Sequence, residues 1–144
     1  MTTQTAPSTA TTATPEATEA STGDPIGWFE IGTPDAAGAR AFYGTVFGWT
    51  FGEDGPYALI TTGAGHALQG GIQDTSTELP PGQPSTYAVP CVQVADVATT
   101  CEKVTAAGGT VVVAATRIPT GLVYGMVADP AGNRVGVFAP PPLT

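Results

Sequence analysis

Two residues that end predicted segments, an aspartate and a glycine, recur in this sequence at the same spacing. This repetition constrains the fold more than any other feature. Asp35 and Asp96 each end a segment of alternating apolar residues, and Gly48 and Gly109 each end the amphipathic segment that follows. Asp96 lies 61 positions after Asp35, and Gly109 lies 61 positions after Gly48. A fixed internal spacing of this kind is the signature of a duplication. The chain is therefore predicted to contain two copies of one supersecondary unit.

The first copy is predicted to begin with a strand over residues 27–33, in which Phe29 and Ile31 alternate with residues of the opposite face. Asp35 is a favoured helix N-cap. The helix that follows carries a stripe at helical spacing, namely Ala39, Phe42, Tyr43 and Val46. Further strands are expected after Gly48 and over residues 57–61 and 67–73, where Gly70 and Gly71 indicate a bulge or a close backbone approach.

The second copy repeats this order. A strand is predicted over residues 87–94, and a helix follows Asp96 with an apolar stripe formed by Val97, Cys101 and Val104. The remaining strands are expected at 109–113, 121–128 and 133–139. The boundaries predicted from this pattern are 25–73 for module one, 74–85 for a Pro-rich linker and 86–142 for module two. Each module thus has the order βαβββ.

Residues 1–24 are nearly all Thr, Ala, Ser, Pro and Gly, with no apolar run. Such a segment cannot bury enough surface to offset the entropy of ordering, so we expect a disordered tail. It lacks the basic and hydrophobic regions of a signal peptide, and no stretch of the chain suits a bilayer. These features predict a cytoplasmic protein, in which Cys91 and Cys101 are free buried thiols.

The formal net charge is −8 at pH 7, from 4 basic and 12 acidic residues. An acidic surface repels phosphate backbones and anionic lipid headgroups. Nucleic acid and membrane are therefore not expected as partners, whereas a neutral or cationic small molecule is compatible with this charge. The same charge is also explained by solubility alone.

Several short motifs resemble the vicinal oxygen chelate superfamily, which contains glyoxalases, bleomycin-resistance proteins and extradiol dioxygenases. They are T-P-D followed by A-F-Y-x-x-V-F-G-W in the first half, V-A-D-V and A-A-G-G in the second, and D-P-A-G-N near the C-terminus. The resemblance extends from about Ile26 to Pro140. It implies an α+β fold in which two βαβββ modules form a curved mixed sheet that encloses a cup.

Enzymes of this superfamily usually hold a divalent metal in the cup. The positions that supply the ligands correspond here to Trp28, Val89 and Gly136, and none of these side chains can bind a metal. We therefore expect no metal and no other cofactor. One alternative remains open, a rearranged site formed by Glu30, His66 and Gln73.

Strand alternation predicts which side chains face the cup. Phe29 and Ile31 face the helices, so Trp28 and Glu30 face the cavity. The residues predicted to bind a ligand are Trp28, Glu30, Tyr57, Leu59, Val89, Cys91, Gln93, Tyr124, Met126 and Arg134. This set is largely apolar and aromatic, as is usual for a small-molecule pocket.

Glu30 is the strongest candidate for a functional residue in this set. Burial beside Trp28 would raise its pKa, unless Arg134 or a ligand ammonium offsets the effect. It could act as a hydrogen-bond acceptor, as a counter-ion or as a general base, and the alternative is a structural salt bridge with Arg134 or a place on the exposed rim. Cys91 as a nucleophile is a weaker hypothesis, because no histidine is placed beside it.

The leading hypothesis is a metal-independent protein that binds a small organic molecule, such as an antibiotic or another secondary metabolite, in an aromatic cup. The resemblance implies that it forms a homodimer. The first alternative is a metal-free lyase, isomerase or cyclase with Glu30 as general base and with Tyr124 or Arg134 stabilising negative charge. A metal-dependent glyoxalase or dioxygenase is the third hypothesis.

Overall fold

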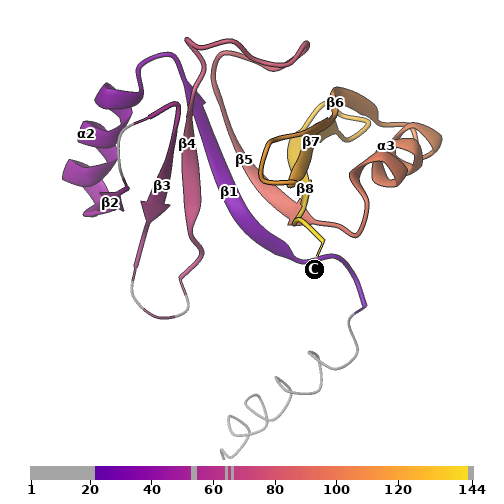
Figure 1. Cartoon of the computed structure of the whole chain (residues 1–144), viewed down its shortest axis with the longest axis horizontal. Coiled ribbons are helices and arrows are strands. Elements are labelled where there is room, and N and C mark those ends of the chain that lie inside the picture. The colour runs from indigo at the N-terminus through magenta and orange to yellow at the C-terminus, as the bar shows by residue number, and fades with distance from the viewer. Residues whose placement is uncertain (1–21, 53–54, 64, 66, 143–144) are drawn as a thin grey trace, which may run out of the picture.

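The computed structural model describes residues 22–52, 55–63, 65 and 67–142 of the chain. The predicted tail lies almost wholly outside these residues, and so does His66. The described residues form one mixed sheet and two helices (Figure 1). In chain order the elements are β1 (Ile26–Thr33), α2 (Ala36–Phe47), β2 (Thr50–Phe51), β3 (Tyr57–Thr61), β4 (Gly70–Asp74), β5 (Tyr87–Gln93), α3 (Val97–Ala106), β6 (Thr110–Arg117), β7 (Val123–Ala128) and β8 (Arg134–Ala139).

This order confirms the predicted architecture of two βαβββ modules. The sheet runs β2-β3-β4-β1-β5-β8-β7-β6, so each module contributes four neighbouring strands. β1 pairs with β4 in parallel, and β5 pairs with β8 in parallel. The modules meet where β1 and β5 pair antiparallel, in the middle of the sheet. In Figure 1, β1 and β5 lie between α2 at one end and α3 at the other.

The helix starts follow the predicted capping. The Asp35 carboxylate accepts a hydrogen bond from the backbone N–H of Gly38 at 3.0 Å, and α2 ends at Gly48 with φ 74°, where glycine avoids the cost of a left-handed conformation. The Asp96 carboxylate accepts bonds from the Thr99 N–H and hydroxyl at 2.8 and 2.6 Å. The repeated spacing therefore reflects two helices that begin in the same way.

The helices pack on the face of the sheet that alternation predicted. Val97 of α3 is buried against a cluster that contains Val94, Val127 and Val137. In module one, Ile31, Ile60 and Ile72 form a separate core cluster, against which the partly buried side chains are Phe29, Ala36, Ala39, Tyr43, Trp49 and Phe51. The opposite face is thereby left free to form the cup.

Part of the predicted α2 stripe is wrong. Ala39 and Tyr43 pack on the sheet, but Phe42 and Val46 are 57% and 53% exposed. Residues spaced by three and four positions cover a wide arc of a helix, and α2 rests on the sheet through one edge of that arc only. The stripe therefore includes side chains that this sheet does not cover.

Some strand limits also differ from the prediction. β4 begins at Gly70, and its register with β1 and β3 is regular, so the glycine pair marks close approaches and no bulge. β6 continues to Arg117, with register shifts against β7 after Val111 and after Val113. Cys91 is a buried free thiol and Cys101 a half-buried one. Among the described residues, neither helix is long and apolar enough to cross a membrane.

Candidate functional site

A cavity of about 600 Å³ occupies the face of the sheet opposite the helices. Most of its wall comes from strands of both modules, and the rest comes from the connections around them. Eight of the ten residues predicted from alternation line it, namely Trp28, Glu30, Tyr57, Leu59, Val89, Cys91, Tyr124 and Met126. Gly136, the third position of the family's metal ligands, lines it as well.

Two predicted residues lie elsewhere. Gln93 and Arg134 are exposed and do not line the cavity. Gln93 is the last residue of β5, and Arg134 is the first residue of β8, beside the turn that joins it to β7. Alternation assigned both to the correct face, but it carries no information on where along a strand the cavity ends. The predicted roles of Arg134 as a partner or charge stabiliser of Glu30 are corrected accordingly.

Glu30 is the centre of the polar groups in the cavity. Its Oε1 accepts a hydrogen bond from the Tyr57 hydroxyl at 3.0 Å, and its Oε2 accepts one from the Tyr87 hydroxyl at 2.6 Å. Each hydroxyl is itself an acceptor. The Trp28 indole Nε1–H donates to Tyr57 at 2.8 Å, and the Gln83 amide Nε2–H donates to Tyr87 at 2.8 Å. Two hydrogen-bonded arms therefore converge on one carboxylate.

Two glycines make room for the tyrosine rings. A methyl group at Gly32, which pairs with Tyr87 between β1 and β5, would overlap the Tyr87 ring. A methyl group at Gly71 of β4 would overlap the Tyr57 ring in the same way. Each ring thus lies flat across the strand next to its own. The close approach predicted at the glycine pair is confirmed, and at Gly71 the approaching group is a side chain.

Burial raises the pKa of the Glu30 carboxyl, and the hydrogen bonds from Tyr87 and Tyr57 act in the opposite direction without cancelling the rise. Burial also raises the pKa of both phenols far above the ordinary value, with repulsion by Glu30 as the second cause. The phenols therefore stay neutral and serve as donors. Glu30 therefore has two neutral hydroxyl groups as partners, and not the salt bridge with Arg134 that the sequence left as an alternative.

Cys91 lies in the wall of the cavity but is a poor nucleophile. Burial, followed by the nearby Glu30 charge, raises the pKa of its thiol to about 12. Nucleophilic cysteines have a lowered pKa, because the thiolate is the reactive species. The environment of Cys91 is thus that of an inert core thiol.

The three positions that supply metal ligands in this superfamily hold no metal-binding side chain here. Trp28, Val89 and Gly136 present an indole, an isopropyl group and a hydrogen atom to it. Gln73 lines the cavity, but its amide Nε2 donates to two backbone carbonyls at 3.1 Å. Within the described ranges, no three His, Cys, Asp or Glu residues gather in a group that could hold a metal. His66, the third member of the alternative metal site, lies outside those ranges.

The sequence reasoning missed two residues that belong to the hydrogen-bond network of Glu30, Tyr87 and Gln83. Tyr87 lies two positions before Val89 in the same strand, so alternation places it on the same face and could have identified it. Gln83 belongs to the predicted linker, where no periodic signal exists. Besides Gln83, the lining residues that the sequence reasoning missed are Pro56, Val113, Ile118, Leu122, Gly125, Val137 and Phe138, and Gln73 is considered there only as a metal ligand.

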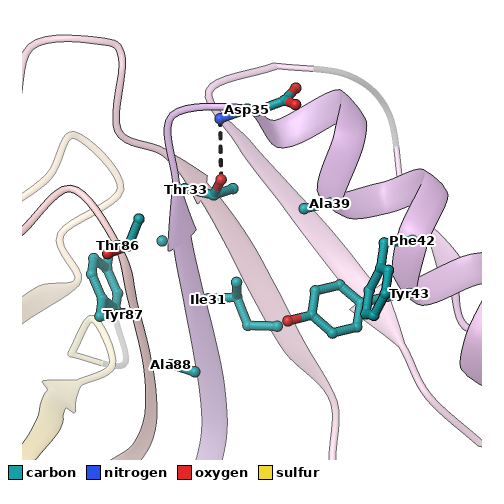
Figure 2. A pocket seen from close by; sticks show the side chains of 10 residues that line it. Ile31, Thr33, Asp35, Ala39, Phe42, Tyr43, Thr86, Tyr87 and Ala88 are labelled. Carbon is teal, nitrogen blue, oxygen red and sulfur yellow. Dashed lines mark hydrogen bonds between the residues drawn. The ribbon is translucent and has the colours of Figure 1, made fainter.

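A smaller hollow of about 370 Å³ lies on the helix side, between α2 and the strands β1 and β5 (Figure 2). Figure 2 shows Tyr43 directed toward Ile31, and it shows the Thr33 hydroxyl accepting a hydrogen bond from the backbone N–H of Asp35 at 3.1 Å. Among the described residues of this lining, Asp35 alone has a charged side chain, and it caps α2. The larger cavity is therefore the candidate site.

The sequence matches the model of the glyoxalase/bleomycin resistance protein/dioxygenase superfamily over residues 25–137. The protein CFP32 of Mycobacterium bovis, provisionally named a glyoxylase, is 29% identical over 124 residues, which cover 77% of this chain and 44% of that protein. A protein of the same name from Mycobacterium tuberculosis gives the same values. The chain spans less than half the length of these curated relatives.

Solved structures show a similar fold at low sequence identity. Methylmalonyl-CoA epimerase from Mycobacterium tuberculosis is 15% identical with a TM-score of 0.52, over 80% of this chain and 87% of that chain. A hypothetical protein from Bacillus halodurans is 12% identical with a TM-score of 0.58, over 84% of this chain and 97% of that chain. At these identities the similarity concerns the fold alone.

Proposed function

Because the chain belongs to the glyoxalase/bleomycin resistance protein/dioxygenase superfamily, we propose that it binds a small organic molecule in the cup without a metal ion. The observation that carries the proposal is one carboxylate, held by two phenols, in a cavity whose described lining is largely apolar. A volume of about 600 Å³ is typical of small-molecule sites. Antibiotics and other secondary metabolites are ligands of this size and polarity.

The exposed part of the wall supports a binding role. Leu59 and Tyr57 line the cavity and remain 56% and 37% exposed in the free protein. When a ligand covers large apolar side chains that are exposed to solvent, the free energy of the complex falls by about 25 cal/mol for each Å² of apolar surface removed from water. A ligand seated in the cup would remove this surface from water.

The metal-free part of the proposal is tested by elemental analysis. Protein prepared without chelators should contain zinc, nickel, iron and manganese at far less than one atom per chain. The same preparation should bind an apolar probe in calorimetry, and dialysis against EDTA should leave the affinity unchanged. A stoichiometric divalent metal, or a loss of binding after EDTA, would overturn this part.

A second candidate function is metal-free catalysis by a lyase, isomerase or cyclase with Glu30 as general base. The raised pKa of Glu30 favours it, since a base works best when its pKa lies near the operating pH. Tyr124 lines the cavity, and burial raises the pKa of its phenol, so it would stabilise developing negative charge as a neutral donor.

Glu30→Gln separates the two functions. A binding protein should keep the affinity for a neutral ligand within about threefold. An enzyme should lose turnover by about 10²–10⁴-fold while it still binds the substrate. Unchanged turnover in this variant would remove Glu30 as the base.

We also propose that the protein is a homodimer. Phe42, Val46 and Phe47 of α2 are 57%, 53% and 57% exposed, and clustered exposed apolar side chains often mark contact surfaces. Light scattering should give about twice the chain mass of 14.4 kDa. A monomer mass at micromolar concentration would contradict the proposal.

A further inference from the structure

Most hydrogen-bond donors described in the cup already have acceptors within the protein. The Trp28 indole donates to Tyr57, and the hydroxyls of Tyr57 and Tyr87 donate to Glu30. The Gln73 amide nitrogen donates to two backbone carbonyls, both at 3.1 Å. Among the described lining residues, the Tyr124 hydroxyl is the phenol donor left for a ligand.

The acceptors, in contrast, are in excess. Each carboxylate oxygen of Glu30 accepts one phenol hydroxyl, and a carboxylate oxygen has room for about two donors. The Gln83 Oε1 is buried and has no hydrogen-bond partner. A polar lining with spare acceptors and few donors is complementary to a ligand that brings its own N–H groups.

The direction of the network favours the ionised form of Glu30. An indole N–H donates and cannot accept, so the Tyr57 oxygen accepts the hydrogen bond from Trp28 and the Tyr57 O–H donates to Glu30. The Tyr87 oxygen accepts a hydrogen bond from the Gln83 amide, and the Tyr87 O–H likewise donates to Glu30. Both arms therefore donate to the carboxylate, which is the arrangement that suits an anion.

This anion lacks a counter-ion in the cup. Glu30 is the one lining residue with a charged side chain in the part of the chain that the structure describes. Two neutral hydroxyls stabilise a half-buried carboxylate less than a cation would, and even partial removal of an unpaired charge from water is costly. The chain carries a net charge of −8, so its overall field attracts cationic molecules to the protein more than anionic ones.

We propose that the ligand of the cup is an apolar molecule bearing a protonated amine, with the ammonium bound to the Glu30 carboxylate. This inference rests on the proposed binding function and specifies its ligand class. The ammonium supplies the missing positive charge and the N–H donors together. The Tyr57 hydroxyl contacts Glu30 and the Trp28 indole contacts Tyr57, so two aromatic rings of a kind that attracts cations lie near the carboxylate. Val89 and Met126 line the cavity and would contact the apolar body.

The test compares three probes that share one apolar body, phenylbutylamine, phenylbutanol and phenylbutyrate. Calorimetry on the full chain at neutral pH should give an affinity for the amine at least about tenfold higher than for the alcohol, and the carboxylate probe should bind weakest. In Glu30→Gln the amine should bind within about threefold of the alcohol, while the alcohol keeps its wild-type affinity.

Glu102→Gln is the matched control, since it removes one negative charge from the exposed surface of α3, away from the cavity. This variant should keep the preference for the amine. Equal loss of the preference in Glu102→Gln and Glu30→Gln would assign it to the net charge and overturn the inference. An alcohol or carboxylate that binds wild type as tightly as the amine would overturn it too, with the binding function intact. Absence of binding for all three probes would contradict the proposed function itself.

Discussion

At the scale of single residues, Glu30 is subject to two opposing effects. Removal from water favours its neutral form, whereas the hydroxyls of Tyr57 and Tyr87 favour the carboxylate. Removal from water is the larger effect, so the pKa of Glu30 stays raised. The two tyrosines therefore adjust how readily Glu30 accepts a proton, and a ligand ammonium would add to their effect.

Removal of either hydroxyl should raise the pKa of Glu30 further. Tyr87→Phe is expected to have the larger effect, since the bond from Tyr87 lowers this pKa more than the bond from Tyr57. Carbon-13 NMR of the labelled Glu30 carboxyl, followed through a pH titration, measures the change directly. Tyr124→Phe is a suitable control, because Tyr124 lines the cavity without a hydrogen bond to Glu30. A lower pKa in Tyr87→Phe would contradict the role assigned to this bond.

At the scale of elements, each tyrosine arm depends on a glycine in a neighbouring strand. Gly32 of β1 leaves space for the Tyr87 ring, and Gly71 of β4 leaves space for the Tyr57 ring. A strand glycine ordinarily weakens a sheet, because it lacks a side chain to pack and costs conformational entropy. Here the neighbouring ring occupies the space that a side chain would fill.

Gly32→Ala should destabilise the protein by about 1–3 kcal/mol, as overpacking of a well-filled site does. It should also raise the pKa of Glu30, because the displaced Tyr87 would no longer donate to the carboxylate. Urea unfolding measures the first effect and the carboxyl NMR titration the second.

Gly44→Ala provides the matched control for Gly32→Ala. Its new methyl group would meet only ordinary contacts, at 3.5 Å or more, inside α2. An alanine in a helix interior should stabilise the protein by about 1 kcal/mol. If both variants were equally stable, the steric role of Gly32 would be refuted.

The elements also show what could be predicted from the sequence. Alternation and capping residues determine the two modules and the inward direction of Trp28 and Glu30, because local periodicity reports which face is buried. The ends of the cavity depend on how far each strand extends beside its neighbours. Alternation does not report this, so Arg134 was wrongly predicted to line the cavity. Gln83 lies in a connection without periodicity, so no pattern in the sequence directs its side chain to Tyr87, although the two residues are four positions apart.

At the scale of the whole molecule, acidic groups affect the pH dependence of stability in opposite directions. Hydrogen bonds hold the pKa values of Asp74, Asp96 and Asp129 below the usual range, so their stabilisation is lost as pH falls. The pKa of Glu30 is raised in the folded state. Its contribution is therefore complete below its ordinary value of 4.5 and is lost as pH rises through the folded value.

Glu30→Gln should remove this second contribution and leave the first. The free energy of unfolding of the variant, minus that of wild type, should increase as pH rises from about 4 to about 8, with about 1.4 kcal/mol for each unit by which the Glu30 pKa is raised. Urea unfolding at several pH values measures this difference, and Glu102→Gln controls for the loss of a surface charge. A difference that does not change with pH would show that the folded protein leaves the proton affinity of Glu30 unaltered.

The antiparallel pairing of β1 with β5 records how the two halves have diverged. Trp28 pairs with Cys91 and Glu30 pairs with Val89, and Val89 and Cys91 follow Trp28 and Glu30 by the repeat spacing of 61. The pairing is thus a local twofold symmetry in which the backbone is matched and the chemistry is not. At the two Glu30-equivalent positions, one half has an acid and the other an inert thiol. The two copies share one backbone arrangement and differ at this position, and the second copy joins the Glu30 network through Tyr87 of β5 instead.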